Sequence, residues 1–316
     1  MKLGELELTG HTILAPMAGV TDWAYRTVCA ELGAAVTVTE MVSSRALVYQ
    51  DKKSRSLLRK TPLGVCGAQI FGNDPAIMAE AAALALEISG CDFLDINMGC
   101  PMPKIAGNGD GCALMQKPEL EAVVRAVRVP VTVKMRKGWD KGSVNCVELA
   151  QAVEAAGASA VCVHGRTKTM LYSGIADWDA IRAVREAVRI PVVANGDVFD
   201  AEAALRCAKR TGASLLMIGR SAFGNPWVFP QVEAALSGNE IPPLPPLARR
   251  MDTAMHQFEL AREDKGDHIA CLEARKHFAW YLRGVAHSSY YKEKISSIST
   301  PEDVEAIAKG IRRDLQ

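Results

Sequence analysis

The sequence lacks the features of a membrane protein, a secreted protein or a metal-stabilised protein. None of its 316 residues belongs to a stretch that reaches the roughly 18 consecutive apolar residues of a membrane span. The N-terminus is not a signal peptide, because Glu5 and Glu7 interrupt any apolar core there. Nine cysteines are scattered singly without a Cys-x-x-Cys pair, which fits a reducing compartment and argues against disulfides or structural zinc. We therefore expect a soluble, cytoplasmic protein with no bound metal and no membrane partner.

The sequence also lacks an excess of either charge. Lys and Arg number 37 and Asp and Glu 36, for a net charge of +1. This balance argues against nucleic-acid binding through overall charge, although it leaves room for a local basic patch. Apolar residues make up 49% of the chain, enough to bury a core and to exclude disorder as the main state. The length predicts one large domain with a smaller one, or two domains.

Short apolar runs recur through the first three quarters of the chain. Each run is typical of a strand that is buried on both faces. Helical patterns over residues 74–90, 143–157, 177–188 and 200–212 lie between them, most with Asp near the start and Gly at or near the end. Eight such βα units in about 230 residues predict a (β/α)₈ TIM barrel, an α/β fold. The expected strands are Thr12–Ala15, Val36–Thr39, Val65–Ile70, Phe93–Ile96, Val131–Met135, Ala160–Val163, Val192–Ala194 and Leu215–Ile218.

A doubly wound open sheet is the alternative fold. Such a sheet usually carries a Gly-x-Gly-x-x-Gly phosphate loop after its first strand. Here the first expected strand is followed by Pro16-Met17-Ala18-Gly19, which does not fit that pattern. The barrel is therefore the favoured architecture.

The barrel pattern ends near Gly238 and a different region follows. Residues 241–247 contain four prolines and predict a stiff, extended linker. Beyond the linker, residues 248–262, 268–287 and 301–315 have helical patterns without a strand signal. We expect a catalytic barrel over residues 1–240, a proline-rich linker over 241–247 and a small all-helical domain over 248–316.

Polar side chains gather at the carboxyl ends of the expected strands, where a barrel forms its active site. A buried strand that ends in Lys, Gln or Asn is destabilised unless something pairs with that group, so the repetition favours a polar ligand. Gly196, Gly219 and Arg220 follow the last two strands, the usual phosphate site of this fold. Lys134 suits a cofactor that gains negative charge on reduction, and Gln69 and Asn97 can satisfy polar ring atoms. A monophosphate cofactor of this kind would be FMN.

Cys100 lies in a Gly-Cys-Pro loop at the same rim. A thiol with an ordinary pKa of about 8.5 stays protonated at neutral pH, which indicates a proton donor. A nucleophile would need a base, for which His164 is a candidate two strands away. The glycine-rich segment 104–114 has no strong helical or strand pattern and is expected to act as a mobile flap over the site.

Several motifs together resemble the tRNA-dihydrouridine synthases, nearest the bacterial B subgroup. The resemblance covers nearly the whole chain, including Ala274-Arg275-Lys276-His277 in the tail, and its motifs are jointly specific. One departure is Ala106, which stands where the family's usual stretch has Asn. The other motifs are Pro16-Met17-Ala18-Gly19-Val20-Thr21-Asp22, Asp95-Ile96-Asn97-Met98-Gly99-Cys100-Pro101, Lys134-Met135-Arg136, His164-Gly165-Arg166-Thr167, Ala194-Asn195-Gly196-Asp197 and Met217-Ile218-Gly219-Arg220.

The resemblance implies an enzyme that reduces the C5=C6 bond of particular uridines in tRNA, with bound FMN and with NADPH as hydride source. Cys100 matches the family's catalytic proton donor. Asn97 and Arg166 are expected beside the substrate base or the flavin, and Arg275, Lys276 and His277 are expected to contact tRNA. The implied flavin contacts are Pro16, Met17, Ala18, Gln69, Lys134, His164, Asn195, Gly196, Asp197, Gly219 and Arg220. We expect the protein to act as a monomer.

The tail has a composition that suits RNA. Residues 275–294 hold five basic residues against one acidic residue, interleaved with aromatic residues. Phosphate neutralisation combined with base stacking is how proteins hold RNA. The alternative is that the aromatic residues form the core of the helical domain while the charges are solvated, and Phe278 and Trp280 favour that alternative.

Three other functions remain open from the sequence. A dihydroorotate-dehydrogenase-like FMN enzyme would act on a free pyrimidine and would not need the basic tail. An RNA-binding protein with a vestigial barrel would hold no flavin. An aldolase-like lyase would use Lys134 as a Schiff base.

Overall fold

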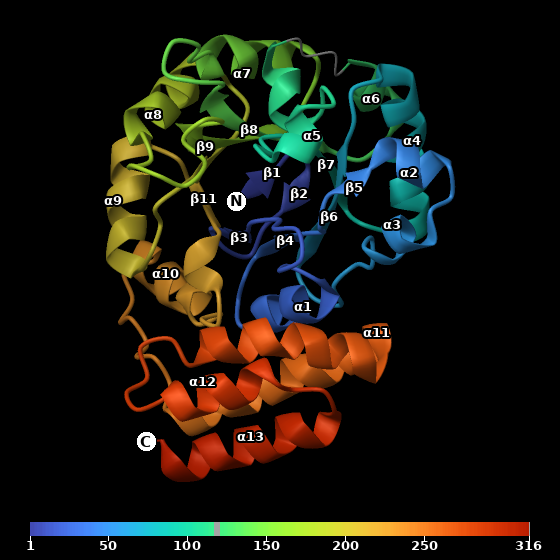
Figure 1. Ribbon diagram of the computed structural model, residues 1–316. Helices are drawn as coiled ribbons and strands as arrows, with labels where there is room; N and C mark the ends of the chain where they lie inside the picture. Colours follow the sequence, from blue (N-terminus) through green and yellow to red (C-terminus); the bar gives the residue numbers. More distant parts are fainter. Residues whose placement is uncertain (117–120, 316) are drawn as a thin grey trace.

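The computed structural model describes residues 1–116 and 121–315. Its main body is a closed ring of parallel strands, in which β3 pairs with β4 and β11 and the pairing of β4 with β6 closes the ring. Figure 1 shows the ring above a separate group of helices formed by the tail. The predicted TIM barrel is confirmed. Its strands are β3 (Thr12–Leu14), β4 (Val36–Val38), β6 (Val65–Phe71), β7 (Phe93–Met98), β8 (Val131–Gly138), β9 (Ala160–Thr167), β10 (Val192–Asn195) and β11 (Leu215–Ile218).

Helices surround the barrel, and their ends carry the capping residues that the sequence suggests. Asp74 accepts hydrogen bonds from Ala76 N and Ile77 N at the start of α4, and Gly90 ends that helix with φ +62°. Asp177 and Asp200 cap α8 and α9 in the same way. The helices are α1 (Trp23–Glu31), α2 (Ser44–Val48), α3 (Lys52–Ser56), α4 (Pro75–Ser89), α6 (Glu121–Ala126), α7 (Cys146–Ala155), α8 (Trp178–Ala187), α9 (Ala201–Thr211) and α10 (Val228–Leu236).

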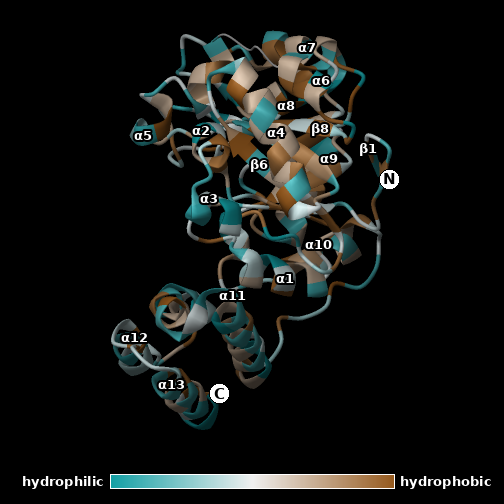
Figure 2. Cartoon of the chain, turned by 90° about the vertical axis from the view of Figure 1, so that its right-hand side faces the viewer, coloured by the Kyte–Doolittle hydropathy of each residue, from teal (hydrophilic) through white to brown (hydrophobic). Residues whose placement is uncertain are grey.

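Two apolar layers hold the barrel together, one between the strands and helices and one inside the ring. Figure 2 shows brown around β6 in the barrel wall, whereas α3 and α13 at the surface are largely teal. A short hairpin, β1 (Lys2–Leu3) with β2 (Leu6–Glu7), contributes Leu3 to the inner layer. The sequence pattern did not predict this hairpin, because each of its strands spans only two residues.

The structure differs from the expectation in three loop regions. The segment expected to be an unstructured flap contains α5 (Pro103–Ala106) and a 3₁₀ helix, η1 (Gly111–Gln116). A two-residue strand, β5 (Val42–Ser43), extends the sheet beside β6. Helix α7 begins at Cys146 instead of Ser143, because Val144 forms an antiparallel bridge with Gly138 and is held in an extended conformation.

The tail is helical, as expected, with different boundaries. Residues 241–246 have no regular structure, and α11 (Leu247–Tyr281) begins directly after them. Gly266, with φ +77°, kinks α11 where the sequence predicts a break between two helices. Two further helices follow, α12 (Ser289–Ser296) and α13 (Pro301–Asp314). No helix in the described parts of the chain is long and apolar enough to cross a membrane.

The tail and the barrel share an apolar core. Ala24 of α1 and Trp227, which directly precedes α10, belong to the same buried cluster as Phe258, Phe278 and Tyr281 of α11. Gly224 allows a close approach of the two parts, since a Cβ atom there would lie 2.2 Å from the backbone carbon of Trp280. Helix α11 therefore lies directly below the barrel, next to α1, in Figure 1.

Candidate active site

A cavity of about 650 Å³ opens at the carboxyl ends of the barrel strands. It brings together residues of the strands β6 to β11 and residues of the loops at this end of the barrel. All of the flavin contacts implied by the resemblance line this cavity, and so do Asn97 and Cys100. The implied contacts are Pro16, Met17, Ala18, Gln69, Lys134, His164, Asn195, Gly196, Asp197, Gly219 and Arg220.

Parallel register explains why these residues meet. Asn97 of β7 lies opposite Lys134 of β8, and His164 of β9 lies opposite Asn195 of β10. The Lys134 ammonium donates a hydrogen bond of 3.2 Å to Asn195 Oδ1, and the Asn195 amide donates to the carbonyl of Met217. Polar groups from neighbouring strands therefore satisfy one another at the cavity floor.

A line of hydrogen bonds begins at the buried carboxylate of Asp95 and ends at Cys100. Asp95 accepts from the side chains of Thr132 and Gln69, the latter at 2.6 Å. Gln69 Oε1 accepts from Asn97 Nδ2 at 2.9 Å, and Asn97 Oδ1 accepts from the backbone N–H of Cys100 at 2.9 Å. Because a carboxylate only accepts, it fixes the orientation of both amides in turn. Burial raises the pKa of Asp95 to about 6, against the lowering effect of these donors.

Cys100 holds its thiol at the cavity wall. The residue is 9% exposed, and burial raises the pKa of its thiol above the usual value. The thiol is therefore protonated at neutral pH and can donate a proton. Its loop is held by Asn97, as described above, and by Arg136, whose Nε donates to the carbonyl of Gly99 at 3.0 Å.

Four cations converge on the site. Burial and the charges of Lys134, Arg136, Arg166 and Arg220 together lower the pKa of His164 far below its usual range. The imidazole is therefore neutral, and because its protonated form is strongly disfavoured it is a weak base for Cys100. A positive field of this kind favours an anionic ligand.

Asp197 is the counter-charge at this edge of the cavity. Arg166 forms two contacts of 2.8 Å with its carboxylate, and Arg220 approaches it at 3.4 Å. Arg166 is 2% exposed and does not line the cavity, so it lies behind Asp197 instead of beside a ligand. Arg220 is half-buried, and within residues 1–116 and 121–315 its hydrogen-bond partner is Asp197, at 3.4 Å from Nη2.

The glycine at position 196 leaves no room for a side chain. Gly196 has φ +118°, and a Cβ atom there would lie 2.7 Å from the Cβ of Ala176 and 3.0 Å from the His164 ring. Its backbone therefore forms part of the cavity wall next to Arg220.

Sequence reasoning missed several residues at the mouth of the cavity. Tyr172 and Phe199 are each 53% exposed, although they are large aromatic residues. The Arg220 guanidinium lies 4.7 Å from the Tyr172 ring centre and 5.9 Å from that of Phe199. Both residues stand alone in loops, and no local pattern marks them.

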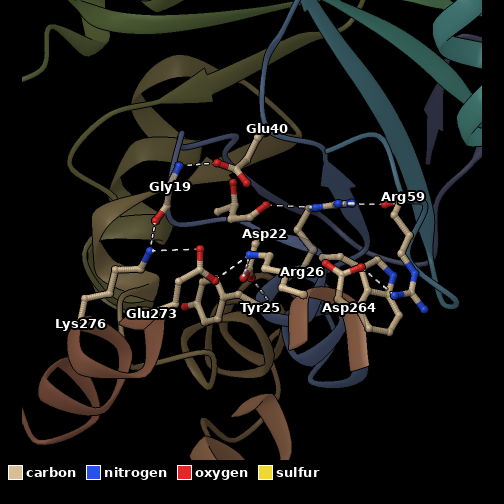
Figure 3. A network of polar contacts seen from close by, with 12 residues as sticks. Gly19, Asp22, Tyr25, Arg26, Glu40, Arg59, Asp264, Glu273 and Lys276 are labelled. Atoms are coloured by element: carbon tan, nitrogen blue, oxygen red, sulfur yellow. Dashed lines mark hydrogen bonds and ion pairs between the residues drawn. The ribbon is translucent and has the colours of Figure 1, made fainter. Parts of the chain in front are cut away.

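The three tail residues expected to contact tRNA make contacts within the protein. Arg275 donates two hydrogen bonds to the carbonyl of Ile298, and His277 is 5% exposed between the rings of Tyr25 and Trp280. Lys276 reaches the barrel and donates to the carbonyl of Gly19 (Figure 3). Their contact with tRNA stays a prediction.

Comparison with known proteins identifies the family. Residues 13–315 match the family described as dihydrouridine synthase (Dus). The tRNA-dihydrouridine synthases B of Klebsiella pneumoniae and Escherichia coli (strain K12) are each 42% identical to this chain, covering 97% of it and 98% of their own lengths. The probable tRNA-dihydrouridine synthase of Rickettsia conorii is 38% identical, covering 95% of this chain and 93% of its own. The chain therefore belongs to the dihydrouridine synthase family.

Proposed function

We propose that this enzyme reduces the C5=C6 bond of specific uridines in tRNA to give 5,6-dihydrouridine. The observation that carries the proposal is the convergence of a protonated thiol and an electropositive floor in one cavity of about 650 Å³. The names of its relatives support tRNA as the substrate.

The cavity residues fit FMN as the cofactor. Arg220 and the backbone of Gly196 and Gly219 offer donors for its phosphate, and Lys134 stands where negative charge on a reduced flavin ring would be stabilised. Gln69 is held in place by Asp95 and borders the cavity with its amide. Bound FMN, once reduced by NADPH, supplies the hydride that C6 of the uridine receives.

Cys100 completes the reduction by supplying the proton. Its thiol donates a proton to C5 while C6 gains the hydride, so the ring gains two hydrogens and the thiol becomes a thiolate until solvent protonates it again. Asn97 and Arg136 keep the Cys100 loop fixed during this step. His164 is neutral and therefore exerts no charge effect on the Cys100 thiol.

The target base has to leave the RNA stack to reach the cavity. Tyr172 and Phe199 are exposed at the mouth and offer aromatic faces on which a flipped base or its neighbour can stack. Arg220 beside them can neutralise a phosphate. The exposed basic residues Arg283, Lys292 and Lys294 of the helical tail would extend this docking surface to the tRNA body.

Two measurements test the proposal. The purified protein should be yellow and release FMN on denaturation, and deletion of its gene should remove dihydrouridine from defined tRNA positions. Restoring the gene should restore those positions. A colourless protein, or an unchanged dihydrouridine map in the deletion strain, would contradict the proposal.

A further inference from the structure

We infer that helix α11 of the tail is part of the flavin site, and that Lys276 is a positioning residue that holds the cavity segment around Gly19. The inference rests on the proposed function, because it concerns the binding of FMN. It gives Lys276 a role other than the tRNA contact that the sequence suggested.

The segment in question, residues 15–22, joins β3 to α1 and forms one wall of the cavity. Ala15, Pro16, Met17, Ala18 and Val20 all line that cavity. The segment is folded on itself, since the N–H groups of Val20 and Thr21 both donate to the carbonyl of Met17. A shift of Gly19 therefore moves the neighbouring lining residues with it.

Gly19 is held from both sides by groups of different domains. Its N–H donates to the buried carboxylate of Glu40, which follows β4 in the barrel. Its carbonyl accepts from the ammonium of Lys276 on α11, as the dashed lines of Figure 3 show. Gly19 has φ +70°, a conformation that glycine adopts without strain, so these two hydrogen bonds are what fix the position of its peptide groups.

A second anchor fixes the other end of the segment. Asp22 is 5% exposed and caps α1 by accepting from Tyr25 N at 2.9 Å. Lys265 of α11 lies 2.6 Å from the Asp22 carboxylate and 2.6 Å from Glu273. Burial raises the pKa of Asp22, but Lys265 and His277 outweigh it and hold that pKa at about 2. The carboxylate thus stays charged, and the pairing with α11 persists at neutral pH.

The same helix is fixed against the barrel by its apolar face and by outer polar contacts, among them His256 Nε2 at 2.9 Å from the Glu31 carboxylate. Ala24 packs into the tail core, and Arg59 pairs with Asp264 at 2.7 Å. The donors Lys265 and Lys276 thus belong to a helix that is packed against the barrel. Loss of the Lys276 donor should therefore shift Gly19 and the neighbouring residues that line the cavity.

The test measures how tightly the holoenzyme retains FMN when no RNA is present. Lys276→Met removes the ammonium and keeps most of the apolar stem, so the variant is expected to fold. Serial dilution of each holoenzyme, with flavin fluorescence reporting release, gives its Kd for FMN. Lys276→Met should raise that Kd about fivefold, the effect of one partly exposed charge-assisted hydrogen bond.

Two further variants sharpen the test. Lys276→Arg can still donate to Gly19 and should recover most of the affinity. Lys309→Met removes a lysine from the exposed face of α13 and should leave the Kd unchanged. Far-UV spectra and melting curves that match the wild type show that each variant is folded.

The outcomes separate this inference from the proposed function. An unchanged Kd in Lys276→Met overturns the inference, and a flattening of the salt dependence of tRNA binding by about one unit in that variant would then assign Lys276 to RNA contact. A wild-type protein that holds no FMN would instead refute the proposed function itself.

Discussion

Replacing Asp95 by leucine should lower turnover while leaving global stability near that of the wild type. Asp95 accepts from Thr132 and Gln69, and through Gln69 and Asn97 it sets the geometry of the Cys100 backbone. Leucine has a similar size but accepts no hydrogen bond. Asparagine is the matched control, because its oxygen can still accept from Gln69 while its amide donates to the Thr132 hydroxyl.

Two opposing energies explain the small change in stability. Burial raises the pKa of Asp95 from 3.8 to about 6, so keeping it ionised at pH 7 costs about 3 kcal/mol relative to the unfolded chain. Leucine removes this cost but leaves the Gln69 amide and the Thr132 hydroxyl without their acceptor, which costs about 1–3 kcal/mol for each group. The two terms nearly cancel. Turnover should nevertheless fall by about 10- to 100-fold, because a small misplacement of the reacting group has effects of that size.

The raised pKa also predicts a pH dependence with a definite sign. A group whose pKa is higher in the folded state stabilises the fold below its unfolded pKa, and that stabilisation is lost as pH rises through the folded pKa. The unfolding free energy of the wild type, minus that of Asp95→Asn, should therefore fall between pH 4 and about 6 and level off above it.

Urea unfolding from pH 4 to 7 and single-turnover dihydrouridine formation on one tRNA provide both readouts. The expected pattern is a slow Asp95→Leu, a nearly normal Asp95→Asn, and an unfolding free energy of Asp95→Leu within about 1.5 kcal/mol of the wild type at pH 7. Equal activity loss in both variants would refute the argument from amide orientation. So would a stability difference that does not change with pH.

Other variants test single features of the cavity and of the domain contact. Gly196→Ala should raise the FMN Kd by at least about tenfold, because its Cβ would collide with Ala176 and its φ of +118° is strained for alanine. Equal retention of FMN by the variant and the wild type in ultrafiltration would contradict this. Gly224→Ala should lower the unfolding free energy by more than about 2 kcal/mol, because its Cβ would meet the backbone of Trp280. A decrease of less than about 0.5 kcal/mol in a urea titration would count against that contact. Tyr172→Ala should raise the KM for tRNA while leaving the FMN Kd unchanged, and the opposite pattern would move Tyr172 into the flavin contacts.

The barrel was predictable because its strands are buried on both faces. Each strand is a short run of apolar residues, such as Leu215–Ile218, whose boundaries the sequence and the structure share. The gathering of Gln69, Lys134 and Asn195 was predictable for a related reason, because parallel strands deliver their carboxyl ends to the same rim.

The loops and the tail were less predictable because their structure depends on tertiary contacts. The glycine-rich segment after Cys100 forms η1, with the Cys112 N–H bonded to the Cys100 carbonyl, and glycine content alone suggested no such contact. Basic residues in a tail suggest an RNA surface, but Arg275 and Lys276 reach backbone carbonyls of the protein itself. Composition gives the charge of a segment and not the direction in which its side chains point.

The central claim is that Cys100 donates the proton in the reduction of a tRNA uridine. The direct measurement is dihydrouridine formed per minute on tRNA purified from a strain that lacks the gene, with NADPH in excess. Cys100→Ala should retain its flavin and fall by at least about 100-fold, the scale of a positioned acid, while Cys207→Ala in the outer helix α9 should stay near the wild type. Near-normal dihydrouridine formation by the flavin-loaded Cys100→Ala protein would contradict the account.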